Sequence, residues 1–185
     1  MSNTVLLDDY IPMAIQECER LKNLADRAIA QLEAGQFFTA PGEGDNSIAV
    51  IVKHVSGNMR SRWQDFLTTD GEKPDRKRDL EFIITAADSR EALIARWAEA
   101  WGILFAELKP LRSSDLARSV TIRGESLSVL QAINRQLTHY AYHVGQIVYV
   151  AKHLAGARWK SLSIQVGESE KFNKAPAKYL GTGKR

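Results

Sequence analysis

The sequence predicts an all-α protein whose four amphipathic helices pack as a four-helix bundle. First, apolar residues recur at alternating steps of three and four residues along four stretches of about 20–27 residues each. Second, the five prolines fall near the start of the first stretch, between stretches or in the C-terminal tail, where a helix interior is not interrupted. Third, 185 residues with 44% hydrophobic and 25% charged residues suit one soluble domain with its own core.

The first predicted helix covers residues 8–33. Its apolar stripe consists of Ile11, Ala14, Cys18, Leu21, Ala25, Ala28 and Leu32. Because Cys18 occupies a stripe position, we expect a small buried core residue rather than a reactive thiol. A single cysteine also rules out a disulfide within the chain.

The second and third predicted helices cover residues 47–68 and 89–109. Asn46 and Ser47 supply N-cap chemistry before the second helix, and the run 88–91 resembles a capping box before the third. The Val and Ile residues near the start of the second stretch would also suit a strand. The continued spacing of three and four residues favours a helix.

The fourth predicted helix, residues 128–154, is the longest, and Gly156 is a suitable stop signal. Before it, residues 119–122 and 125–127 flank Arg123-Gly124, which predicts a short hairpin. At least two connections are long enough to cross over. The spacing of the helices therefore leaves the topology open.

The net charge of +3 arises in the last 18 residues, which contain five basic and two acidic side chains. We therefore divide the chain into a helical domain, residues 1–167, and a basic tail, residues 168–185. The domain is neutral overall and shows no basic stripe, so a nucleic-acid partner is not expected. No signal peptide or membrane-length apolar run is apparent, which predicts a cytoplasmic protein with no membrane partner.

Three of the four histidines are placed to hold one ion. His139 and His143 are separated by one helical turn on the fourth helix, and His54 lies in the middle of the second helix. Three imidazoles on two helices make a site with an open position, suited to a divalent transition metal such as Zn, Ni or Fe. His153 is about 15 Å further along the fourth helix and is expected to be a helix-end cation.

Two further features each allow two interpretations. The segment 70–79 carries four acidic and four basic residues, and is either a solvated loop or a loop that covers a site. Gly57, Gly102 and Gly145 lie inside predicted helices at a cost of about 1 kcal/mol each relative to alanine. They indicate close approach of helices or, near the histidines, room for a ligand.

The segments 47–63, 69–74 and 139–147 together resemble the DinB/YfiT-like superfamily, within a branch of bacterial proteins of unknown function. The similarity extends over most of residues 5–167. It implies a four-helix bundle with up-up-down-down connections, often a homodimer. It also implies a divalent metal held by His54, His139 and His143.

Some members of that superfamily are S-transferases or isomerases that use low-molecular-weight thiols. The first functional hypothesis is therefore a metal-dependent thiol S-transferase acting on a small electrophile. Asn58, Gln146, Arg62 and Arg135 are the candidate cofactor-binding or substrate-binding residues, and no general base stands out. The alternative is a non-catalytic, stress-related or interaction module, a dimeric bundle with a structural metal, with Trp97, Trp101 and the charged loop 70–79 at the interface.

Overall fold

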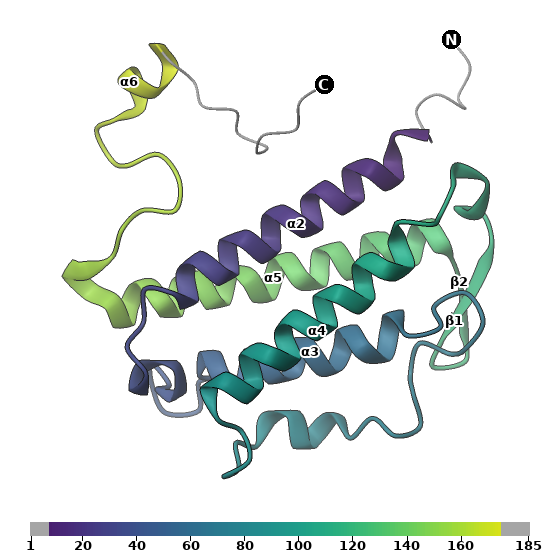
Figure 1. Ribbon diagram of the computed structural model, residues 1–185, viewed down its shortest axis with the longest axis horizontal. Coiled ribbons are helices and arrows are strands. Elements are labelled where there is room, and N and C mark those ends of the chain that lie inside the picture. The colour runs from purple at the N-terminus through teal and green to yellow at the C-terminus, as the bar shows by residue number, and fades with distance from the viewer. Residues whose placement is uncertain (1–7, 175–185) are drawn as a thin grey trace.

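The computed structural model describes residues 8–174, which are mostly helical, with five α-helices and a small two-stranded sheet (Figure 1). The all-α prediction is confirmed. The long helices are α2 (Tyr10–Ile29), α3 (Ile48–Trp63), α4 (Arg90–Leu108) and α5 (Val129–Ala155). The sheet consists of β1 (Ser119–Ile122) and β2 (Glu125–Ser128), and α6 (Ser169–Lys174) is short.

Serine side chains start three of the four long helices. Ser47, Ser89 and Ser128 each accept a hydrogen bond from a backbone N–H in the first turn of α3, α4 and α5. The end of α3 differs from the prediction, because the helix stops at Trp63 instead of continuing to residue 68. The chain leaves helical geometry at the next residue, and Asp65 adopts a left-handed φ of 53°.

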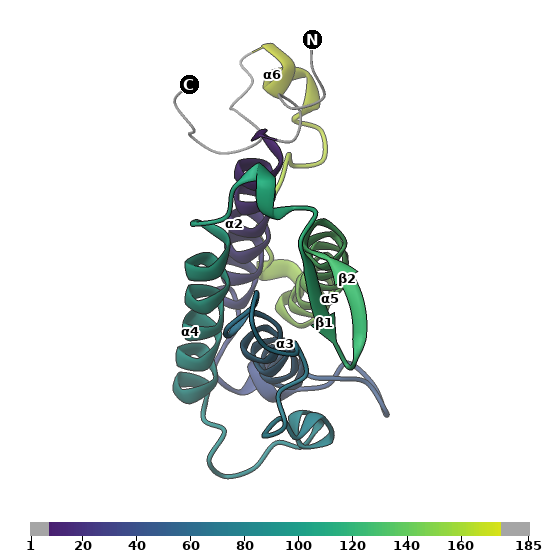
Figure 2. The same ribbon diagram turned by 90° about the vertical axis from the view of Figure 1, so that its right-hand side faces the viewer.

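The directions of the helices follow from contacts at their ends. The Tyr10 hydroxyl donates to Asn134 Oδ1 over 2.8 Å, and Gln31 Nε2 donates to the Lys160 carbonyl over 3.0 Å. The early part of α2 therefore lies beside the early part of α5, so these helices are parallel. Figure 1 shows α3 and α4 running in the opposite direction, and Figure 2 shows the helices from the side on which the hairpin lies.

The resulting order is up-down-down-up, so the up-up-down-down prediction is wrong. The connections 30–47 and 109–128 each turn the chain back at one end of the helices, whereas the connection 64–89 runs back along their length (Figure 1). Sequence spacing showed that at least two connections were long enough to cross over. It did not show that only this one among the described connections does so.

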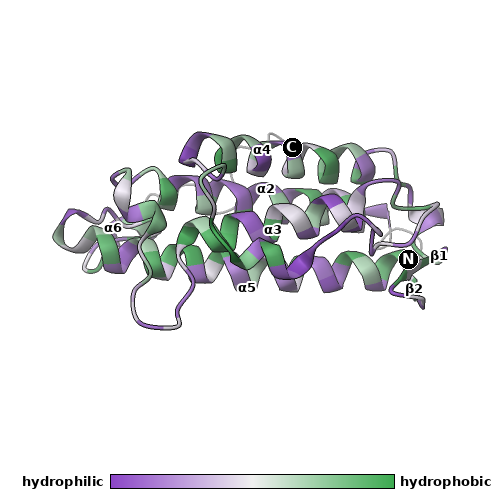
Figure 3. Cartoon of the chain, turned by 90° about the horizontal axis from the view of Figure 1, so that it is seen from below, coloured by the Kyte–Doolittle hydropathy of each residue, from purple (hydrophilic) through white to green (hydrophobic). Residues whose placement is uncertain are grey.

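The core between the helices is apolar and rich in aromatic rings, and in Figure 3 hydrophobic and hydrophilic residues alternate along each long helix. Trp97 and Trp101 are 1% and 0% exposed, so the expectation that they form an interface is wrong. Cys18 is buried at 2% exposure, and burial raises the pKa of its thiol to about 12. Its prediction as a core residue is confirmed.

The predicted hairpin is present as an antiparallel pair, with Arg123 and Gly124 at φ values of 57° and 75° in the turn. Asp70 accepts hydrogen bonds from the backbone N–H groups of both turn residues, each over 2.8 Å. The Gly71 N–H donates to the Thr121 carbonyl over 2.8 Å. The hairpin thus fixes the start of segment 70–79 against the helices.

The predicted tail of residues 168–185 is described only as far as Lys174 and contains α6. Its last eleven residues lie outside the described part of the chain. Among residues 8–174, no helix combines the length and apolar character needed to cross a bilayer.

A buried carboxylate anchors the far end of the long connection. Asp88 is 4% exposed and accepts hydrogen bonds from Lys53 Nζ over 2.8 Å and from the Thr85 N–H and hydroxyl, each over 2.9 Å. Burial alone would raise the pKa of Asp88. The hydrogen bonds from Lys53 and Thr85 outweigh this effect and lower the pKa to about 2.

We expect Asp88 to make the fold sensitive to acid. Because its pKa is lower in the folded chain than in the unfolded chain, its contribution is complete above about pH 4 and is lost as the pH falls toward 2. Urea unfolding of the wild type and of Asp88→Asn at several pH values measures this. The two proteins should differ most in stability near neutral pH and converge as the pH falls to about 2. A constant difference across that range would contradict the assignment.

Candidate metal centre

Three histidine side chains meet between α3 and α5. His54 comes from α3, while His139 and His143 come from successive turns of α5. One ring nitrogen of each lies within 4.8 Å of the other two. His54 is buried and the other two are half-buried. The predicted histidines are therefore brought together in a group that could hold a metal ion.

In the rings of His54 and His143, hydrogen bonds to Nδ1 indicate that Nε2 is the nitrogen free to bind a metal. His54 Nδ1 lies 2.8 Å from Glu81 Oε2, and His143 Nδ1 lies 2.8 Å from Gln146 Oε1. A carboxylate and an amide oxygen accept hydrogen bonds, so we assign the proton of each ring to Nδ1. The Nε2 lone pairs of both rings remain available as ligands, with the outer support typical of metal-binding histidines.

The third ring completes the set. His139 Nε2 lies 3.1 Å from His143 Nε2, close to the roughly 3.3 Å expected between two nitrogens bound to one tetrahedral Zn²⁺. His139 Nδ1 is buried without a hydrogen-bond partner among residues 8–174. His139 therefore lacks the outer hydrogen bond that supports the other two rings.

The electrostatic setting keeps the α5 pair neutral. Burial lowers the pKa of His139 to about 4, and the neighbouring histidines add to this effect. Burial also lowers the pKa of His143. Metal ligation requires unprotonated imidazole, so the donor set fits a divalent transition ion at neutral pH.

Glu81 supports His54 from the long connection. Its carboxylate also pairs with Arg76, whose Nε and Nη2 lie 2.9 Å from Oε1 and Oε2 respectively. Burial would raise the pKa of Glu81, but hydrogen bonds from His54 and Arg76 lower it overall and keep the group ionised. A Cβ atom on Gly57 would lie 2.3 Å from Glu81 Oε1. Gly57 thus makes room for this carboxylate.

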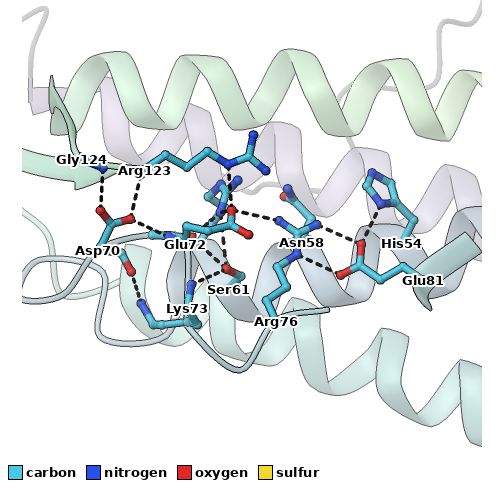
Figure 4. Close-up of polar contacts among 12 residues, drawn as sticks. His54, Asn58, Ser61, Asp70, Glu72, Lys73, Arg76, Glu81, Arg123 and Gly124 are labelled. Atoms are coloured by element: carbon cyan, nitrogen blue, oxygen red, sulfur yellow. Dashed lines mark hydrogen bonds and ion pairs between the residues drawn. The ribbon is translucent and has the colours of Figure 1, made fainter. Parts of the chain in front are cut away.

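The hydrogen bonds and ion pairs that begin at His54 and Glu81 continue through Arg76 to Glu72, away from the histidines (Figure 4). Glu72 accepts from Arg62 over 2.8 Å, from Arg123 over 3.1 Å and from Arg76 over 3.5 Å. Segment 70–79 combines features of both interpretations, because Arg76 is buried against Glu81 whereas residues 77–79 are exposed.

A pocket of about 180 Å³ adjoins the histidines, and His54 and His139 form part of its wall. Three of the four predicted contact residues, Asn58, Arg62 and Arg135, also line it. Gln146 does not line this pocket and instead holds His143 in place.

Sequence reasoning missed several residues of the site. They are Glu72, Arg76, Glu81, Arg123 and Gln136. The glycine three residues after His54 was the one local sign that another group approaches this face of α3. The missed residues come from the long connection, the hairpin turn and α5. These elements are brought together only by the tertiary structure, so no local sequence pattern marks them.

A family model for proteins of unknown function, DUF1572, matches residues 6–168. The chain belongs to the DUF1572 family. No curated protein and no solved structure matches the chain. The DUF1572 region contains the four long helices, the hairpin and the three histidines, and ends one residue beyond the domain end predicted at residue 167.

Proposed function

We propose that the protein binds a divalent transition metal, Zn, Ni or Fe, through His54, His139 and His143 and acts as a thiol S-transferase. The observation that carries the proposal is the meeting of three imidazole nitrogens within 4.8 Å beside a pocket. Three protein ligands leave at least one coordination position open, as in catalytic rather than closed structural sites.

A bound divalent ion would lower the pKa of a thiol at the open position, so that thiolate is present at neutral pH. The chain's own groups hold the site in shape, since Glu81 orients His54 and Gln146 orients His143. Asn58, Arg62 and Arg135 line the pocket where an electrophile would lie. In the transfer, the thiolate sulfur forms a bond to carbon, the leaving group departs with its electron pair, and the thiol proton goes to water.

The resemblance to the DinB/YfiT-like superfamily supports this proposal. The resemblance implies a four-helix bundle that forms a homodimer, and some members of the superfamily use low-molecular-weight thiols. The matching positions here are the three histidines, and their separation suits one ion. The helix order in this chain is up-down-down-up, so the proposed bundle carries that topology.

Metal analysis of protein purified without an affinity tag tests the first half of the proposal, and we expect about one equivalent of a divalent transition ion. Cobalt-substituted protein titrated with cysteine and glutathione tests the second half. Thiol binding should produce a sulfur-to-cobalt charge-transfer band, and the loaded protein should then conjugate monochlorobimane. If the metal binds but no thiol produces the band or any conjugate, the transferase proposal fails.

A second candidate is a non-catalytic homodimer with a structural metal. One observation favours it: Leu80 and Ile83, on either side of Glu81, are 57% and 54% exposed. Exposed apolar side chains beside a metal-supporting group suit a protein interface.

A further inference from the structure

Arginine side chains from four separate parts of the chain gather at the pocket beside the histidines. They are Arg62 from α3, Arg76 and Arg78 from the long connection, Arg123 from the hairpin turn and Arg135 from α5. Like charges repel, so such a gathering needs anions to balance it. The question is whether the protein's own carboxylates suffice.

The two inner arginines are already satisfied. The side chains of Arg62 and Arg76 are 6% and 4% exposed. Arg62 donates to Glu72 and to the Gly71 carbonyl, and Arg76 donates to both oxygens of Glu81. These contacts fix two guanidinium groups rigidly in the wall of the pocket.

The three outer arginines keep unused donors. Arg123 places Nε 3.1 Å from Glu72, a carboxylate that it shares with two other arginines. Arg78 lies 3.6 Å from Asp79, whose side chain is 96% exposed. Arg135 has no ion-pair partner among residues 8–174. Five guanidinium groups thus face three carboxylates, which leaves an excess of positive charge.

A buried amide adds an independent sign of a missing partner. Gln136 lines the same pocket and is 4% exposed, and its Oε1 atom has no hydrogen-bond donor within the described residues. An unsatisfied buried polar atom is costly unless something pairs with it. A ligand with an N–H or O–H group would satisfy it.

We propose that this pocket binds a compact dianion that also carries a hydroxyl group, a hydroxy-dicarboxylate or hydrogen phosphate, whose hydroxyl donates to Gln136 Oε1. Guanidinium groups pair with carboxylate and phosphate oxygens in two-pronged hydrogen bonds, which accounts for arginine rather than lysine at every cationic position of the wall. The volume of about 180 Å³ is below the roughly 300–1,000 Å³ of sites for drug-sized ligands, so the ligand is small.

This inference deepens the proposed function by giving the charge class of its substrate. It rests on that function only where it places the ligand beside the metal. Binding of the anion to the arginines needs no metal. Calorimetric titration of metal-free protein at low salt therefore tests it separately. The probes are malate, inorganic phosphate and malamide, the neutral analogue with the same hydroxyl group, and the first two distinguish the sources of the dianion.

We expect malate or phosphate to bind at least about tenfold more tightly than malamide, as expected for hydrogen bonds to charged groups. Arg135→Gln and Arg78→Gln, both at exposed positions, should each weaken anion binding about tenfold. Arg20→Gln is the matched control, since Arg20 is an exposed arginine on α2 that lines no part of this pocket, and it should leave binding unchanged.

Equal binding of malamide and the dianions would overturn the proposal, as would failure of both anions to bind. Unchanged anion affinity in both pocket variants would overturn it too. If the anions bind as expected but the metal-loaded protein conjugates no thiol, the pocket stands and the transferase proposal falls.

Discussion

Replacing His143 with alanine should lower the affinity for Zn²⁺ by more than about 100-fold. Loss of an outer hydrogen-bond partner typically costs about 10–100-fold in metal affinity, and His143 is itself a proposed ligand. Its Nε2 atom lies 3.1 Å from that of His139. Competition with a chromophoric chelator measures the affinity. His153→Ala is the matched control, because His153 lies in the last turn of the same helix, away from the site.

The same variant separates the two candidate functions. The helices that carry the histidines also pack through the shared apolar core, so the fold does not depend on the ion alone. An open catalytic site predicts that His143→Ala melts within a few degrees of the metal-free wild type. A large loss of stability on metal removal, with no exchangeable water on the ion, would favour the structural metal. Unaltered Zn²⁺ affinity in His143→Ala would rule out the histidine site.

Replacing Glu81 with alanine should destabilise the fold by about 3–5 kcal/mol and weaken metal binding about 10–100-fold. The change leaves Arg76, whose side chain is 4% exposed, without its main partner. It also removes the acceptor that holds His54 Nδ1. For a chain of this length, the stability loss corresponds to a fall in melting temperature of roughly 10 °C.

The double variant Glu81→Ala with Arg76→Met separates these two effects. Methionine removes the buried charge, so much of the lost stability should return. Metal affinity should stay low, because His54 still lacks its acceptor. If metal affinity recovers together with stability, Glu81 acts on the fold alone and does not orient the ligand.

Local sequence patterns predicted the helices and the grouping of the three histidines well. The serine N-caps and the spacing of apolar residues located α3, α4 and α5 to within a few residues at their starts. The pair His139 and His143 follows from helical periodicity, since residues four apart share one face. These features depend on neighbours within one or two turns.

The surroundings of the histidines could not be predicted in the same way. Glu81 reaches His54 across 27 residues of chain through an irregular connection, and no periodicity describes that path. Counting charges also misled, because residues 1–167 are neutral in total while five arginines converge on one pocket. Such a concentration of charge depends on tertiary structure and leaves no mark in composition.

The long connection 64–89 is pinned at three points: Asp70 holds the hairpin turn, Glu81 holds His54, and Asp88 holds Lys53. In polymer terms, three anchors divide one long loop into short ones, and each short segment has few conformations left to lose. The segment that carries Arg76 and Arg78 is therefore ordered before any ligand arrives. A ligand that docks there would meet a rigid receptor, and little of its binding energy would be spent on ordering the chain.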